Sequence, residues 1–347
     1  MSITIDDAFF LRDSEVYDGP HMSWFTPPGV SHTGYGVAAL AYIRALQRKK
    51  IKVSYASEVP YVSVNWIQPE WYRQNPNQYI VGFTPWESTE IPDQWPHYMN
   101  QCQEIWTSST FCADVFKASG IEPPISVVPC GIDPDVWSIV DREVPRKFRF
   151  LHVGGEAGRK NVQLVIDAFI DLFEGNLDVE LVLKSHGSSL GRWTDRAGNW
   201  GGNISNHPQV TSITETFEDE YDLVKLYHDA HCMVYPSSGE GFALIPFQAM
   251  ATGMPTIVTN LTSMADFAEM AMPLKATWGP GHGIHLGDMA VPDEDHLREL
   301  MKSAYENYGE HKKKAMQSAR IIHCTMTWDH YADQIINILG DKLKVNS

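Results

Sequence analysis

The chain has 347 residues, of which 43% are hydrophobic, and a formal net charge of −16. That length allows two domains of ordinary size, and no apolar run approaches the roughly 18 residues of a membrane span. The acidic charge disfavours nucleic acid and anionic membranes as partners, because proteins that bind either one present a basic surface. The five scattered cysteines indicate reduced thiols, and the acidic start Met1–Asp7 lacks a signal-peptide pattern. We therefore expect a cytoplasmic protein.

In the first half, helical and extended patterns alternate. The expected elements are helices over residues 37–48 and 111–118 and strands over 51–55, 79–83, 104–106 and 125–128. This alternation predicts a parallel sheet with helices on both faces.

A charged stretch with proline, residues 141–146, is expected to link this half to a second one. The second half repeats the alternation, with strands over 148–153, 179–184, 232–235 and 256–259, a helix over 162–173 and a last helix over about 328–343. Its polar insertion, residues 186–207, contains several glycines and is expected to form a mobile loop.

A glycine-rich turn separates the strand 148–153 from the helix that follows it. Backbone amides at a helix N-terminus bind phosphate oxygens, and glycines let the chain approach them closely. A lysine there can neutralise a departing diphosphate. The alternative is a surface turn with a capping Asn161. The residues expected to contact phosphates are Gly154, Gly155, Gly158, Arg159 and Lys160.

A second turn follows the strand 232–235 and carries Glu240 at the carboxyl end of that strand, where open α/β sheets bind ligands. Taken alone, Glu240 could simply complement the dipole of the next helix. However, the run Glu240–Met250, followed by Ala251–Pro255, resembles the donor-site signature of retaining GT-B glycosyltransferases of family 4.

In that family, two glutamates eight positions apart bind the donor, the first through the sugar hydroxyls and the second through the ribose diol. The resemblance assigns the first role to Glu240, but Gln248 stands at the second position. An amide can hydrogen-bond a diol but supplies no charge. The other donor-side residues that the resemblance implies are Lys184, Ser238, Gly239, Gly241, Phe242, Ala243 and Leu244.

Weaker resemblances cover most of the rest of the chain. Gly34-Tyr35-Gly36 is similar to the glycine-rich acceptor-side loop, and 106–109 and 128–133 are similar to segments that follow buried strands of the first domain. The turn at Gly154 resembles a Gly-Arg-x-x-x-x-Lys segment, with Lys160 at the lysine and Gly155 in place of the arginine.

The resemblance implies an α/β protein of GT-B fold, with two Rossmann-like doubly wound domains facing across a cleft. The expected parts are an acceptor-side domain (1–140), a nucleotide-sugar domain (147–325) and a C-terminal helix (326–347) that crosses back to the first domain.

Many relatives carry a histidine after the middle strand of the first domain, but this chain has Trp86 and Glu87 near that position. We expect Glu87 to be an acceptor-side catalytic group, with a purely structural carboxylate as the alternative and His97 and His32 in reserve. His282 and His285 lack partners at metal-ligand spacing, and GT-B enzymes usually need no metal.

The sequence thus predicts a retaining glycosyltransferase that uses a UDP- or GDP-sugar and no cofactor. Glu240 and Lys160 are its expected catalytic residues together with Glu87. The acceptor stays open between a glycan precursor or other small molecule and a hydroxylated DNA base in a phage context. The alternatives are a two-lobed protein that binds a nucleotide-sugar without turnover, and a nucleotide-sugar epimerase on the same fold.

Overall fold

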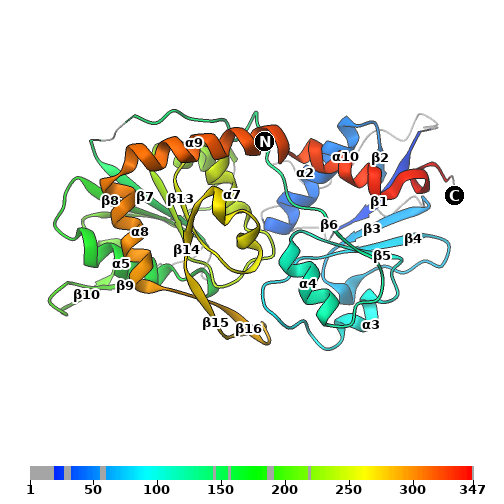
Figure 1. The fold of residues 1–347 in the computed structure, drawn as a ribbon, viewed down its shortest axis with the longest axis horizontal. Helices are drawn as coiled ribbons and strands as arrows, with labels where there is room; N and C mark the ends of the chain where they lie inside the picture. Colours follow the sequence, from blue (N-terminus) through cyan, green and yellow to red (C-terminus); the bar gives the residue numbers. More distant parts are fainter. Residues whose placement is uncertain are drawn as a thin grey trace. The chain divides into compact units, whose positions relative to one another are not determined.

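The computed structural model describes residues 19–26, 33–54, 60–143, 146–154, 158–185, 191–217 and 220–345. The chain divides into two compact units, the first of Met1–Gly131, Ile284–Leu286 and Thr325–Ser347, the second of Ile132–Gly283 and Gly287–Cys324. Each unit contains one six-stranded sheet (Figure 1). Within the described ranges, no helix is long and apolar enough to cross a membrane.

The sheet of the first unit is parallel throughout, in the order β2-β1-β3-β4-β5-β6. Its strands are β1 (His21–Phe25), β2 (Lys52–Ser54), β3 (Val62–Trp66), β4 (Tyr79–Phe83), β5 (Glu104–Thr107) and β6 (Ile125–Val127). Its helices are α2 (Gly34–Arg48), α3 (Trp95–Met99), α4 (Thr110–Ala118) and α10 (Trp328–Leu339). Helices α2 and α10 pack together on one face, and α3 and α4 lie on the other (Figure 1).

Strands β1 and β3 were not among the predicted elements. Both strands contain polar residues that are buried: Ser23, Ser63 and Asn65 are each less than a tenth exposed. The Asn65 side chain accepts a hydrogen bond from the amide of Arg73 at 2.8 Å. These buried polar residues interrupt the apolar pattern that identifies a strand in a sequence.

Aromatic side chains fill the face of this sheet that α2 covers. Tyr42 of α2 lies against Trp24, Phe83 and Trp328, with ring centroids 5.6, 5.6 and 4.8 Å away. Its hydroxyl donates to the carbonyls of Val128 and Pro129. Most tryptophans of this unit are therefore core residues.

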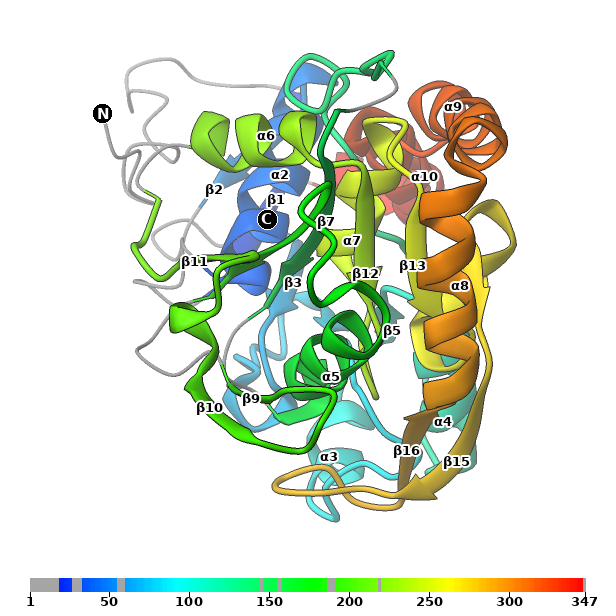
Figure 2. The ribbon, with the colours of Figure 1, turned by 90° about the vertical axis from the view of Figure 1, so that its left-hand side faces the viewer.

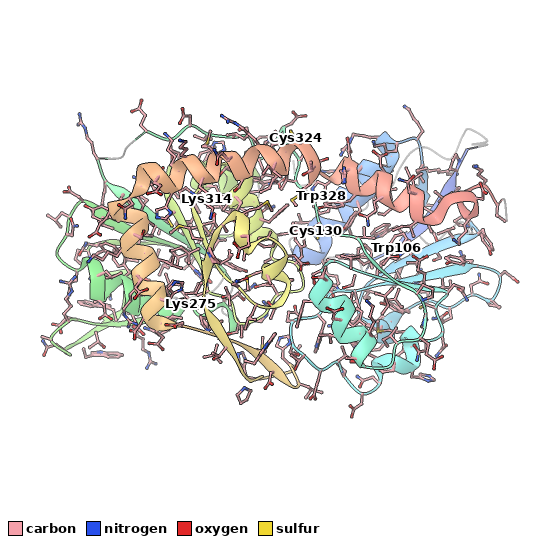
Figure 3. All side chains as sticks on the ribbon, viewed as in Figure 1. Trp106, Cys130, Lys275, Lys314, Cys324 and Trp328 are labelled. Carbon is pink, nitrogen blue, oxygen red and sulfur yellow. The ribbon has the colours of Figure 1, made fainter. Side chains whose placement is uncertain are left out.

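The backbone of Gly131 packs directly against the first residue of α10 in the first unit. A Cβ atom on Gly131 would lie 2.3 Å from the backbone nitrogen of Trp328, so no side chain fits there. Figure 3 shows Cys130, beside this glycine, and Trp328 at the beginning of the helix. The preceding Val-Pro-Cys-Gly segment is thereby fixed against α10.

The boundary between the units differs from the expected linker. It falls between Gly131 and Ile132, upstream of residues 141–146. Arg142, inside the expected linker, is buried in the second unit and donates hydrogen bonds to the carbonyls of Tyr227, Ala230 and Thr252. In the sequence, Arg142 looks like a linker residue because it is charged and lies near a proline. In the structure, its charge is buried because it donates to backbone carbonyls.

The sheet of the second unit is also parallel, in the order β11-β8-β7-β12-β13-β14. Its strands are β7 (Phe148–Val153), β8 (Val179–Lys184), β11 (Val210–Ile213), β12 (Cys232–Tyr235), β13 (Thr256–Thr259) and β14 (Met272–Leu274). Its helices are α5 (Val162–Phe173), α6 (Glu220–Asp229), α7 (Leu244–Ala251), α8 (Glu294–Glu306) and α9 (Tyr308–Thr325). Helices α5 and α8 cover one face side by side (Figure 2).

The predicted bounds of β7, α5, β8, β12 and β13 are confirmed. The predicted apolar stripe of α5 faces the core through Val165, Ile166, Phe169 and Phe173, while Val162 is only partly buried.

The polar insertion is not a simple loop, as far as the structure describes it. It contains an antiparallel hairpin of β9 (Arg192–Thr194) and β10 (Trp200–Asn203). Gly201 lies under the Trp193 ring, where a Cβ atom would come within 2.1 Å of the ring. This glycine allows close packing. A second unpredicted hairpin joins β15 (Ala276–Pro280) to β16 (Asp288–Pro292).

The strand order places a switch point at the centre of the second sheet. From β7 the chain moves to β8 on one side, whereas β12 is followed by β13 on the other. The loops that follow β7 and β12 therefore leave neighbouring strand ends in opposite directions. This is where doubly wound sheets bind their ligands.

Candidate functional site

Hydrogen bonds join the two loops at the switch point. The amide of Ser238 donates to the carbonyl of Arg159 at 2.7 Å. The side-chain amide of Asn161 donates to the Pro236 carbonyl and to the Ser238 hydroxyl, both at 2.8 Å. Asn161 has a left-handed backbone, with φ of 53°, which asparagine tolerates better than most residues. Instead of capping α5, its side chain fixes the spacing between the loops.

Glu240 is the centre of a buried cluster in which four donors reach one carboxylate oxygen. Its Oε1 accepts from the Arg159 guanidinium at 2.9 Å, the Tyr235 hydroxyl at 3.0 Å and the Ser237 hydroxyl at 2.7 Å. The Lys160 ammonium makes a hydrogen-bonded ion pair with the same oxygen. The glycine-rich turn and the Glu240 turn, far apart in sequence, are thus in direct contact.

The cations decide the charge state of this carboxyl. Burial alone would raise the pKa of Glu240, but Lys160 and Arg159 outweigh it, with hydrogen bonds from Lys160 and Ser237, and lower the pKa from 4.5 to about 2. The cluster therefore contains an anion and two cations at neutral pH.

This shift predicts a pH dependence of stability. A carboxyl with a lowered folded-state pKa contributes stability that is complete above its unfolded pKa and is lost as the pH falls toward the folded value. Between pH 5 and pH 3, wild type should therefore lose about 2 kcal/mol more unfolding free energy than Glu240→Gln. Urea unfolding of both proteins at the two pH values measures this. Equal losses would show that Glu240 is not held as an anion by its partners.

Two further residues of the cluster were not predicted, Tyr235 and His152. The Tyr235 hydroxyl accepts from the Lys160 ammonium at 2.5 Å while donating to Glu240. His152 in β7 stacks on Tyr235, with ring centroids 6.0 Å apart. Burial lowers the pKa of His152 to about 4, so the ring is neutral and its Nδ1 hydrogen bonds to the Val234 carbonyl at 2.9 Å. Each of these two residues is a polar residue near the end of a mostly apolar central strand, and this pattern was the available sign of them in the sequence.

Gln248 lies in α7 and is 8% exposed. Among the described residues, no hydrogen bond of its side-chain amide is found. The amide is not among the fully enclosed, unpaired side-chain atoms of the described residues, so it keeps access to the surface and can meet a polar ligand group. Nearby in sequence, Phe242 packs on Phe247 and Phe267, and Ala243 has a left-handed backbone with φ of 76° just before α7. Gly239, Gly241 and Leu244 complete the predicted segment; Gly239 and Gly241 are buried and Leu244 is partly buried.

The remaining donor-side predictions lie at different places. Gly154 is buried, and a Cβ atom there would be 3.1 Å from Nε2 of His152, whereas Gly158 is exposed at the start of a short 3-10 helix. Gly155 lies outside the described residues. Lys184 is not part of the Glu240 cluster, because its ammonium donates to the Ser185 and Glu215 carbonyls at 3.1 and 2.7 Å.

The predicted acceptor-side residues gather in the first unit. Tyr35 begins α2 together with Gly34 and Gly36, and its hydroxyl lies 3.1 Å from that of Thr84, which follows β4. Burial first, and then the charge of Glu87, raise the pKa of Tyr35. Trp86 is buried and fixed by Cys112, whose sulfur donates to its carbonyl at 3.1 Å. Glu87, the next residue, is half-buried beside this pair.

Of the two histidines held in reserve, only His97 belongs to the part of the chain that the structure describes. His97 contacts Gln101 on the surface, and His32 lies outside the described residues. No group of three or more His, Cys, Asp or Glu residues that could hold a metal occurs in the described ranges.

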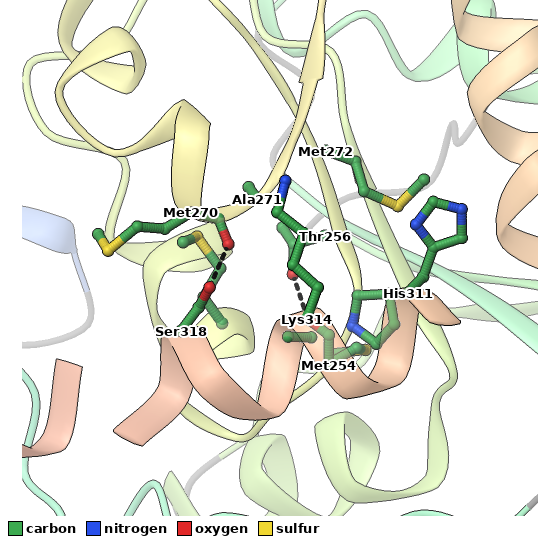
Figure 4. A pocket seen from close by; sticks show the side chains of 11 residues that line it. Met254, Thr256, Met270, Ala271, Met272, His311, Lys314 and Ser318 are labelled. Atoms are coloured by element: carbon green, nitrogen blue, oxygen red, sulfur yellow. Dashed lines mark hydrogen bonds between the residues drawn. The ribbon is translucent and has the colours of Figure 1, made fainter. Parts of the chain in front are cut away.

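A pocket beside β14 and α9 is a poor candidate for a substrate site. Four methionines, His311, Lys314 and Ser318 are among its lining residues (Figure 4). It encloses about 10 Å³, roughly the space that one water molecule needs. None of the predicted site residues lines it.

The predicted fold class is confirmed by solved structures: the chain has the fold of GT-B glycosyltransferases. It matches sucrose-phosphate synthase of Thermosynechococcus elongatus with a TM-score of 0.67 at 12% identity, over 92% of this chain and 98% of that one. It matches a glycosyltransferase of Rickettsia africae with a TM-score of 0.63 at 12% identity, over 95% and 100%. A trehalose-6-phosphate protein of E. coli bound with UDP-2-fluoro glucose gives 0.62 at 12% identity, over 90% and 78%.

The chain belongs to the family described as family 4 glycosyltransferases in conflict systems, whose model matches residues 111–335, more than half of the chain. Two curated relatives are mannosyltransferases. A serotype-specific mannosyltransferase of Escherichia coli is 32% identical over 111 residues, which cover 31% of this chain and 13% of that protein. The human alpha-1,3/1,6-mannosyltransferase is 25% identical over 178 residues, covering 45% and 42%. The chain thus spans less than half of the length of either relative.

Proposed function

We propose that this protein transfers a hexose from a UDP- or GDP-sugar to a hydroxyl acceptor, with retention at the anomeric carbon. The observation that carries the proposal is the meeting of Lys160 and Arg159 with Glu240 at the switch point of the second sheet. Two cations suit a diphosphate, and a charged carboxylate suits sugar hydroxyls. Membership of a glycosyltransferase family supports the same reading.

In the proposed reaction, the bond between the anomeric carbon and the diphosphate oxygen breaks while the acceptor oxygen bonds to the same face of that carbon. The acceptor proton passes to the departing diphosphate oxygen. Lys160 and Arg159 stabilise the charge that develops on the diphosphate. Glu240 orients the sugar through its hydroxyls. No protein nucleophile is needed, and we expect activity to persist in a metal chelator.

The acceptor that we favour is a small hydroxyl compound or glycan precursor. The two mannosyltransferase relatives support a carbohydrate acceptor and a hexose donor. The net charge of −16 opposes a DNA acceptor, because a duplex would meet a largely acidic protein. Glu87, close enough to Tyr35 to affect its ionisation, is the group that we assign to the acceptor hydroxyl.

Gln248 is the residue that we assign to the ribose. It is buried on α7, the helix that follows the Glu240 turn, and its amide can both donate to and accept from a diol. The change from an expected glutamate to glutamine leaves the site with one negative charge fewer. We therefore expect binding of the nucleoside to depend on hydrogen bonds rather than on charge.

Calorimetric titration with UDP, GDP and ADP tests this assignment. One of the three should bind to wild type, and Gln248→Leu, which removes both hydrogen-bonding groups at similar size, should weaken that binding about 10-fold. Gln163→Leu, an exposed glutamine on α5, is the matched control. If Gln248→Leu keeps full affinity, a residue other than Gln248 binds the ribose. If wild type binds none of the nucleotides, the proposed donor site is wrong.

A further inference from the structure

The cations of the proposed diphosphate site are paired with a carboxylate of the protein itself. Lys160 and Arg159 both bind Glu240, and Arg159 also donates to the Gly239 carbonyl at 2.7 Å. Glu240 is only 6% exposed, and the Lys160 side chain 11%. The anion that neutralises these cations is thus the same carboxylate that the proposed reaction assigns to the sugar.

We propose that Glu240 is an internal competitor of the diphosphate and that donor binding proceeds by exchange. The diphosphate takes Lys160 and Arg159, and the released carboxylate turns to the sugar hydroxyls. This inference rests on the proposed donor site and adds a rule of specificity to it. A nucleotide-sugar satisfies both the cations and the carboxylate, whereas a nucleoside diphosphate without a sugar leaves Glu240 without its charged partners.

The geometry makes such an exchange feasible. All four donors bind Oε1 of Glu240, and two of them are the neutral hydroxyls of Tyr235 and Ser237. When the cations turn to a diphosphate, these hydroxyls can stay on the carboxylate, so that it is not left buried without partners. They come from β12 and from the turn after it, not from the loop that carries the cations, and the Ser237 hydroxyl also lies 3.2 Å from the carbonyl of Arg159.

If Glu240 competes with the diphosphate for the two cations, removing Glu240 should strengthen the binding of a diphosphate that carries no sugar. A site in which Glu240 contacts only the sugar would not show this gain. We expect Glu240→Gln to bind inorganic pyrophosphate and the preferred nucleoside diphosphate about 10-fold or more tightly than wild type, since a competing buried anion is gone. The nucleotide-sugar should lose its advantage over the nucleoside diphosphate in this variant, because the sugar contact is lost.

Isothermal titration of the full chain with pyrophosphate, the nucleoside diphosphate and the nucleotide-sugar measures these affinities. Glu299→Gln, on the exposed face of α8, removes the same charge elsewhere and should bind as wild type does. Glu240→Asp keeps the charge but shortens the side chain by one methylene, so it should also bind pyrophosphate more tightly if direct contact matters.

The outcomes separate the exchange from the donor site itself. If wild type binds the nucleoside diphosphate and Glu240→Gln binds it equally or more weakly, the exchange is wrong and the donor site stands. If Glu240→Asp binds as wild type does and only Glu240→Gln gains affinity, charge alone explains the effect and the exchange is again wrong. If neither wild type nor any variant binds a nucleotide, the proposed function fails first.

Discussion

Lys160→Met is expected to reduce kcat of sugar transfer by about 10³-fold, in line with the loss of one preorganised group that stabilises developing charge. Lys160 is the buried ammonium at the switch point, and its partners are the hydroxyl of Tyr235 at the end of β12 and Glu240 in the loop that follows. Methionine keeps the length and the apolar stem of lysine but cannot meet the departing diphosphate. Steady-state release of nucleoside diphosphate from the preferred donor measures the effect.

The matched control for this experiment is Lys184→Met. Lys184 is a buried lysine at the carboxyl end of the adjacent strand β8, but it binds the Ser185 and Glu215 carbonyls. We therefore expect this variant to lose no more than about 10-fold in kcat, because it removes no charge from the Glu240 cluster. Equal losses in the two variants would mean that Lys160 has no special role in the transition state.

Arg142→Met is expected to have the largest effect on stability. The guanidinium donates to the carbonyls of Tyr227, Ala230 and Thr252 and to the Thr252 hydroxyl, each at 2.8 Å. These groups lie at the C-terminal ends of α6 and α7, where a cation is favoured by the helix dipole. Burial lowers the pKa of Arg142 to about 10, so it stays charged at neutral pH. Methionine would leave several buried carbonyls without donors, at a cost of about 3–5 kcal/mol.

Differential scanning calorimetry measures this loss. For a unit of this size, about 3 kcal/mol corresponds to a fall in Tm of roughly 6–12 °C. The affected transition is expected to be that of the second unit, which the preferred nucleotide should shift upward in both proteins. Arg146→Met, a nearby change at an exposed arginine, should leave Tm within about 1 °C. If the two variants have the same Tm, Arg142 does not tie α6 and α7 together.

The sequence could predict those helices and strands in which the apolar residues of the local pattern are also the buried residues. Strand β12, helix α7 and strand β13 have short apolar runs separated by glycine and proline, and the predicted bounds of both strands match the structure. Strands β1 and β3 have buried serines and an asparagine instead, so their pattern is hidden. The hairpin of β9 and β10 has no continuous apolar face, and its glycines suggested mobility although Gly201 packs under Trp193.

The site could be predicted as two turns but not as one cluster. Lys160 and Glu240 come together only because β7 and β12 are neighbours in the sheet, which strand order decides and local sequence does not. Tyr235 could not be identified for the same reason, since its role depends on touching both charged groups. Lys184 was expected on the donor side from the family resemblance, yet its side chain binds the Ser185 and Glu215 carbonyls. Arg142 shows the opposite case, in which a residue typical of a linker is buried.

Proton NMR of the anomeric signal tests most directly whether the Glu240 cluster transfers a sugar from a nucleotide-sugar with retention. The spectra are recorded while wild type or Lys160→Met is incubated with α-linked UDP- and GDP-hexoses. With water or a simple sugar as acceptor, we expect wild type to release the nucleoside diphosphate from one series. The first product should be α-linked, and Lys160→Met should leave the donor nearly untouched. A donor that binds but stays intact would indicate a nucleotide-sugar-binding protein, and a β-configured first product would contradict retention.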